Sequence, residues 1–135
     1  MTADELLNKA MIALSSSKLL LDAGDASGAC NRAYYAMFDA ARAALLASKL
    51  SDDVLTIRTH SGLIASFSLK LVKSGLVDIQ LGKALNKIED LRLVADYKGD
   101  PVEMEEATWA LQQATEFVSS MQTSFSLILS KSAKP

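Results

Sequence analysis

Proline occurs only at positions 101 and 135 of the sequence, and long stretches rich in Ala, Leu, Lys, Glu and Gln run between a few glycines. These residues favour the α-helix, whereas glycine commonly ends one. Apolar residues recur within the stretches every three or four positions, which is the spacing of one helix face. The pattern predicts an all-α protein. Its helices are expected at about residues 3–23, 26–49, 59–73, 77–97 and from 101 onward.

The chain has room for one such unit. A chain of 135 residues, half of them apolar, is the size of one typical domain with one core. Short connections between successive helices favour antiparallel packing, so we expect an up-and-down bundle of four or five helices over residues 1–130. Residues 131–135 (KSAKP) carry no large apolar side chain and are expected to fray.

Several helix ends can be located from single residues. Gly24 and Gly75 are predicted to end the first and third helices. Asp100, Pro101 and Glu103 match a helix start with an aspartate cap, a proline in the first helical position and a glutamate in the third, as in a capping box. The stripe expected to be buried on this last helix consists of Ala107, Leu111, Ala114, Val118, Met121, Phe125 and Ile128.

The charge balance limits what the chain can bind. Its formal net charge of −2 excludes a broadly basic nucleic-acid coat, so any nucleic-acid site must be local. One cysteine and one histidine argue against a transition-metal site, and the sequence has no phosphate-cradling glycine loop and no calcium loop. We therefore expect no metal and no cofactor.

The sequence also indicates a compartment. Cys30, the single cysteine, cannot form an internal disulfide, and the first residues, MTADELLNKA, lack the basic start and apolar stretch of a secretion signal. The apolar runs are all much shorter than the roughly 20 residues needed to cross a bilayer. We expect a cytoplasmic protein with no membrane span.

Arg92 lies among apolar residues by helical angle, on the same predicted stripe as Leu85 and Ile88. A guanidinium in such a place costs several kcal/mol unless it is paired or reaches an anionic ligand. Asp96, one turn later, is a ready partner. Two interpretations stay open: an internal ion pair, or an arginine presented to phosphate in a half-buried cleft.

His60 is predicted to head the apolar stripe of the third helix. A histidine in this position is commonly a satisfied core or capping residue. A neutral imidazole close to an arginine would also suit phosphodiester chemistry, in which the base removes a hydroxyl proton and the cation stabilises the phosphorane. The sequence alone does not bring His60 to Arg92.

Two further features are polar or aromatic groups away from the expected core. One face of the second helix, off the Tyr34 stripe, could line a groove, bind a partner or form an ordinary solvated network. Trp109 is expected on the side of the last helix opposite its buried stripe, where it could anchor a dimer or partner interface or be a single surface aromatic. The polar face of the second helix consists of Arg32, Tyr35, Asp39 and Arg42.

Three segments, in this order, resemble the bacterial and archaeal HEPN proteins: NRAYYAMFDAARAALL at 31–46, THSGLI at 59–64 and LRLVADY at 91–97. The resemblance covers about residues 6–121, nearly the whole chain. It implies a four- or five-helix bundle that is usually a dimer. It also implies a gene neighbour encoding a minimal nucleotidyltransferase, in a toxin–antitoxin arrangement.

Many members of that family are metal-independent ribonucleases, with an arginine followed after four to six positions by a histidine. This chain departs from the pattern, because Asp96 and Tyr97 stand where the basic residue and the aromatic would fall after Arg92. The arginines that precede His60 are at the wrong spacing. The resemblance therefore implies binding of nucleotide or RNA more than cleavage.

The preferred hypothesis is a dimeric binding module that recognises the phosphate of a nucleotide or RNA and acts with a nucleotidyltransferase partner. One alternative is a ribonuclease toxin with His60 and Arg92 as the catalytic candidates. Another is a purely structural dimer in which each polar residue satisfies its neighbours. The cleft of the preferred hypothesis is expected to be lined by Arg32, Tyr35, His60, Arg92, Asp96 and Tyr97.

Overall fold

The computed structural model describes residues 1–49, 54 and 57–128, and in these residues the chain contains helices and no strand. The prediction of an all-α fold is confirmed. The helices are α1 (Ala3–Asp22), α2 (Ala26–Ser48), α3 (His60–Phe67), which continues as the π-helical segment η2 (Ser68–Val72), α4 (Ile79–Leu93), which continues as the π-helical segment η3 (Val94–Lys98), and α5 (Met104–Ser124). The predicted fraying of residues 131–135 lies outside the described residues.

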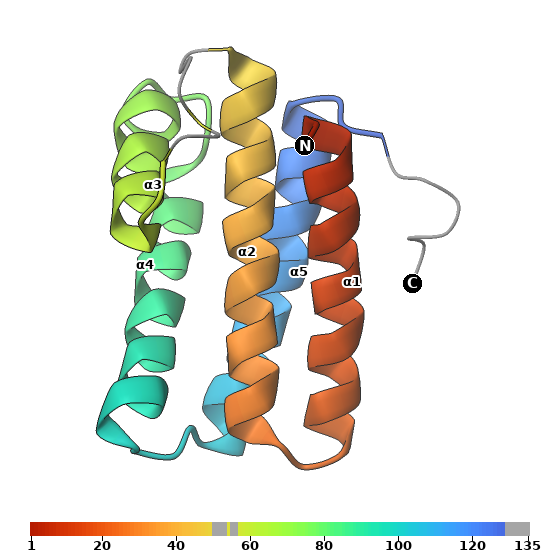
Figure 1. The fold of residues 1–135 in the computed structure, drawn as a ribbon, viewed down its shortest axis with the longest axis vertical. Helices are drawn as coiled ribbons and strands as arrows, with labels where there is room; N and C mark the ends of the chain where they lie inside the picture. Colours follow the sequence, from red (N-terminus) through yellow and green to blue (C-terminus); the bar gives the residue numbers. More distant parts are fainter. Residues whose placement is uncertain (50–53, 55–56, 129–135) are drawn as a thin grey trace.

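Helix α2 lies at the centre of the bundle (Figure 1). It packs against α1 and α5 on one flank and against α3 and α4 on the other. The four long helices alternate in direction along the chain, as the short connections predict, and the short α3 completes the bundle beside α4. None of the described helices is long and apolar enough to cross a bilayer.

Side chains and glycines set most helix ends. Gly24 follows the cap of α1 and Gly75 lies two residues after the cap of η2, and both have positive φ, at 87° and 85°. Each N-terminal cap satisfies a backbone N–H that has no partner within its helix. The caps whose side chains accept such a bond are Thr2 from Glu5, Asp25 from Gly28, Thr59 from Gly62 and Asp78 from Gln80.

The predicted start of the last helix is wrong by three residues. Helix α5 begins at Met104, with Glu103 as its cap, and Glu106 Oε1 accepts the Glu103 N–H at 3.0 Å. The preceding Val102 is buried, and its N–H donates to Ser27 Oγ on α2 at 3.3 Å. This hydrogen bond holds Asp100 and Pro101 outside the helix. The helix therefore starts with the capping interaction between Glu103 and Glu106 and not with Asp100 as the cap.

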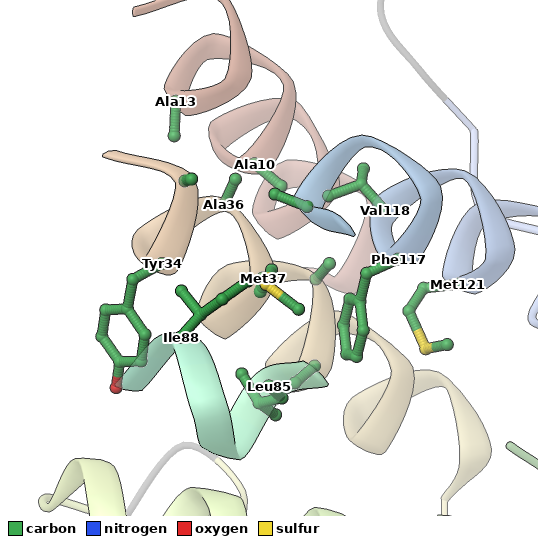
Figure 2. Close-up of a cluster of buried hydrophobic side chains, with 14 of the residues drawn as sticks. Ala10, Ala13, Tyr34, Ala36, Met37, Leu85, Ile88, Phe117, Val118 and Met121 are labelled. Atoms are coloured by element: carbon green, nitrogen blue, oxygen red, sulfur yellow. The ribbon is translucent and has the colours of Figure 1, made fainter. Parts of the chain in front are cut away.

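The core joins α2 to the helices on both flanks. Figure 2 shows Tyr34 and Met37 of α2, Leu85 and Ile88 of α4, and Phe117 of α5 within one buried cluster. Small side chains bring the flanking helices close to α2. The fully buried alanines of α2 are Ala29, Ala33, Ala36, Ala40, Ala41, Ala43 and Ala44.

The far end of the predicted stripe on the last helix is wrong. Ile128 is 69% exposed because α5 ends at Ser124 and the chain then turns, with Ser126 at a positive φ of 55°. The Ile128 N–H donates to Asp4 Oδ1 at 2.9 Å, which ties this turn to the start of α1. The earlier positions Ala107, Ala114, Val118 and Met121 are buried as predicted.

Candidate functional site

Arg92 lies in the last α-helical turn of α4, and its side chain is buried. Its Nη1 donates to Asp96 Oδ2 at 3.2 Å, so the predicted ion pair between successive turns is present. The Asp96 side chain is 40% exposed, against 8% for Arg92, so the carboxylate lies at the outer edge of the pair. Arg92 Nε is buried without a hydrogen-bond partner. The guanidinium is therefore held in place without all its donors being used.

The fold brings His60 to Arg92 from another helix. His60 is the first residue of α3, placed by the Thr59 cap, and its Nδ1 lies 3.4 Å from Arg92 Nη2. The same Nδ1 lies 2.9 Å from the Tyr34 hydroxyl of α2. Three helices thus meet at one imidazole.

Aromatic rings of α2 lie under the two basic groups. The Arg92 guanidinium carbon lies 4.5 Å from the centre of the Tyr34 ring and 5.8 Å from that of Tyr35. The His60 and Phe38 rings lie 4.5 Å apart between centres, with their planes tilted by 37°. Cation–π contacts of this kind contribute about 0.5 to 2 kcal/mol each and offset part of the cost of burying a guanidinium.

Glu89 is the residue at this site that the sequence analysis missed. It lies three positions before Arg92 on α4, and its Oε2 accepts a hydrogen bond from the Tyr34 hydroxyl at 3.3 Å. The helical spacing to Arg92 was the available signal, but a glutamate on an amphipathic helix commonly faces water. Tyr34 is buried as predicted, and its hydroxyl also links Glu89 to His60.

An open pocket of about 500 Å³ lies beside these groups. Four predicted site residues line it, and Asp96 contacts one of them, Arg92. Tyr97 is 78% exposed and forms its outer edge. Arg32 is not in the lining; its guanidinium lies over the Tyr35 ring at 5.2 Å. The residues that line the pocket are Tyr35, His60, Ser61, Glu89, Arg92, Leu93 and Tyr97.

The surroundings of His60 keep its ring neutral at neutral pH. Burial lowers the pKa of His60 below its ordinary 6.5, the nearby Arg92 charge lowers it further, and Glu89 opposes the shift. Burial raises the pKa of the Tyr34 phenol, so this hydroxyl stays protonated. If His60 Nδ1 carries the proton, Nδ1 donates to Tyr34, which donates to Glu89, and Nε2 is left as a free base. If Nε2 carries it, the one lone pair of Nδ1 accepts either from Arg92, with Tyr34 still donating to Glu89, or from Tyr34, whose proton then leaves Glu89.

The polar face predicted on α2 divides into two environments. Tyr35 joins the pocket, whereas Asp39 is buried and away from its lining. Burial raises the pKa of Asp39, and the charges of Lys9, Arg42 and Arg32 oppose the rise. Asp39 is therefore not part of a solvated network, and it lies apart from the pocket.

Trp109 does not lie where the sequence analysis expected it. Its side chain is partly buried and packs against the core, because α4 covers that side of α5. The Lys87 ammonium of α4 lies 4.9 Å from the centre of the indole ring. Trp109 is thus not a free, exposed anchor for a dimer.

The remaining groups with possible chemistry are outside the pocket. Cys30 is fully buried, and burial raises its pKa to about 11, so its thiol is a poor nucleophile at neutral pH. Within the described part of the chain, no three histidine, cysteine or acidic side chains gather as metal ligands.

The chain is similar to known proteins over most of its length. The sequence model of the HEPN domain matches residues 3–123. A UPF0332 protein of Thermotoga maritima is 42% identical over 93 residues, which are 69% of this chain and 66%, slightly less than two thirds, of that protein. A UPF0332 protein of Gloeobacter violaceus is 36% identical over 70% of this chain and 71% of its own length. A protein of Methanocaldococcus jannaschii that is named as a candidate toxin is 34% identical over 86% of this chain and 83% of its own length.

Proposed function

The chain belongs to the HEPN domain family, and from that premise we propose that it binds the phosphate of a nucleotide or RNA in the pocket beside Arg92. One observation carries the proposal. A buried guanidinium lines an open pocket, and its carboxylate partner, Asp96, is not among the residues that line it. Arginine in such a setting recognises phosphate through fixed N–H donors.

The rest of the lining suits the other parts of a nucleotide. Tyr35 and Tyr97 provide rings on which a base can stack. Glu89 provides a carboxylate that can accept a hydrogen bond from a ribose hydroxyl or a base N–H. Its negative charge would repel phosphate, so the phosphate is expected at the other end of the pocket, beside Arg92. One ligand could therefore place its phosphate beside Arg92 and a hydrogen-bond donor beside Glu89.

We extend the proposal to the biological setting that the family resemblance implies. The chain would act in the cytoplasm with a minimal nucleotidyltransferase as its partner, in a toxin–antitoxin system. Two relatives from Methanocaldococcus jannaschii, which are named as candidate toxins, support this setting.

A homodimer is also part of the proposal. The outer face of α2 supports it, because Tyr35, Phe38 and Leu46 pack on the core there and are only partly covered. Light scattering at micromolar protein concentration is expected to give a mass near twice the 14.5 kDa of the chain. The mass of a single chain over the whole concentration range would contradict the dimer.

The second candidate function is metal-independent cleavage of RNA, and the 3.4 Å approach of His60 to Arg92 favours it. In such a reaction a neutral imidazole removes the proton of a ribose 2′-hydroxyl, whose oxygen attacks phosphorus. The 5′-oxygen then leaves with a proton from the imidazolium or water. Arg92 would stabilise the charge of the phosphorane. The arrangement with Nε2 as the free base is the one that allows this.

Incubation with a fluorescently labelled single-stranded RNA in the presence of EDTA distinguishes the two functions. We expect saturable binding by anisotropy, weakened by salt, with the RNA intact on a gel. Cleavage of the RNA that is lost in His60→Ala would favour the ribonuclease function over binding alone. The rate of this cleavage should persist down to pH 6.5, because the pKa of His60 is lowered and its ring stays neutral there. The absence of both binding and cleavage would contradict the proposed function.

A further inference from the structure

A second place with ligand-binding chemistry lies where α4 meets α5, around Trp109. An open hollow of about 330 Å³ lies on one side of the indole, and another of about 220 Å³ shares Lys87 and Trp109 with it. The first, called here the indole hollow, is lined by Gln80, Lys83, Ala84, Lys87, Trp109 and Gln113. The second is lined by Lys87, Leu91, Glu105, Glu106 and Trp109.

The indole hollow carries positive charge that the fold does not neutralise. Lys83 and Lys87 lie one turn apart on α4, a spacing at which like charges repel. Within the described part of the chain neither lysine forms an ion pair. The acidic side chains near Trp109 line the other hollow, and Glu106 Oε1 there accepts the Glu103 N–H. An anion therefore meets two lysines without a facing carboxylate in the lining.

The other groups of the indole hollow are those that hold a nucleobase. Indole rings stack bases of any sequence, and amides such as those of Gln80 and Gln113 both donate and accept hydrogen bonds. At present the Lys87 ammonium lies over the indole, 4.9 Å from the ring centre. A base that stacks on the indole would take the place of Lys87 over the ring, and the displaced ammonium could then pair with the phosphate.

We infer that the indole hollow binds one nucleotide of single-stranded RNA, with the base against Trp109 and the phosphate between Lys83 and Lys87. This site is distinct from the pocket beside Arg92. Lys83 and Arg92 are nine positions apart on α4, which places them on opposite sides of the helix and about 14 Å apart along its axis. The choice of RNA as the ligand rests on the proposed function, whereas the site itself does not depend on the pocket beside Arg92.

Trp109 provides its own signal, because it is the only tryptophan in the sequence. Titration of the full chain with a short single-stranded oligoadenylate is expected to quench its fluorescence to saturation. In the double variant Lys83→Gln/Lys87→Gln the affinity measured by quenching should fall about tenfold or more, and the salt dependence should lose about 0.7 in slope for each lysine. The variant Lys18→Gln/Lys73→Gln, which loses the same charge elsewhere, should behave like the original protein.

Four results would overturn the inference, and the first two come from the RNA titrations themselves. One is RNA binding detected by anisotropy without any quenching of Trp109. The other is equal affinity of the two double variants, provided that circular dichroism shows both to be folded. Equal quenching by an oligoglutamate peptide would assign the hollow to carboxylates instead of nucleotides. Quenching that persists in Arg92→Ala would show that this site is independent of the pocket, whereas loss of binding only in Arg92→Ala would support the pocket and contradict the indole hollow.

Discussion

Replacing Arg92 with alanine is expected to lower the affinity of the pocket for RNA phosphate about 100-fold, which corresponds to about 2.7 kcal/mol at 1.36 kcal/mol per factor of ten. The substitution removes the one buried cation that lines the pocket. It also leaves the charges of Glu89 and Asp96 without that cation, so the pocket would repel an anion. The measurement is anisotropy of a labelled RNA too short to span both proposed sites.

Controls separate loss of the site from loss of the fold. Arg58→Ala removes an equal charge from an exposed position and should leave the affinity unchanged. Arg92→Lys keeps the charge without the planar donors and should give an intermediate affinity. Thermal unfolding of each variant shows whether it is folded at the temperature of the titration. Unchanged affinity in a folded Arg92→Ala protein would exclude the pocket as the phosphate site.

Replacing Phe117 with alanine is expected to lower the free energy of unfolding by about 3 to 5 kcal/mol. The Phe117 side chain is fully buried, and its ring contacts that of Phe67 at 5.5 Å between centres. Its loss leaves a cavity in the part of the core that joins α5 to the other helices (Figure 2). Because a domain is stable by only about 5 to 15 kcal/mol in total, the variant should unfold at a much lower urea concentration.

Phe125→Ala is the matched control for this prediction. Phe125 is the residue that follows the end of α5, and it is only partly buried. The same change should therefore cost clearly less there. An equal loss of stability at both positions, measured by urea unfolding, would show that the cluster around Phe117 has no special weight in the fold.

The helices could be predicted because the signals that set them are local. Gly24, Gly75 and the spacing of apolar residues depend on near neighbours in the sequence. The start of α5 was missed because it depends on the hydrogen bond from Val102 to Ser27, a contact between residues seventy-five positions apart. The π-helical segments that follow α3 and α4 were missed as well, since the sequence pattern there does not differ from that of an ordinary helix.

The site residues also divide into those predicted from local spacing and those set by contacts between helices. Arg92 and Asp96 could be paired from their spacing on one helix, and the structure confirms the pair. The approach of His60 to Arg92 joins residues thirty-two positions apart, and no local pattern encodes it. Glu89 was missed because its role depends on the Tyr34 hydroxyl of another helix. Reasoning on the sequence found the unusual side chains, and the tertiary structure decided which of them meet.

The pocket beside Arg92 lies between α2 and the hairpin formed by α3 and α4. Tyr34 and Tyr35 belong to α2, which alanine packing locks to α1 and α5, whereas His60 and Arg92 belong to the hairpin of α3 and α4. A ligand that contacts both sides would bridge the two parts. A partner that moved the hairpin away from α2 would separate His60 and Arg92 from the aromatic rings of α2. Binding in this pocket would therefore oppose separation of the α3–α4 hairpin from the rest of the bundle.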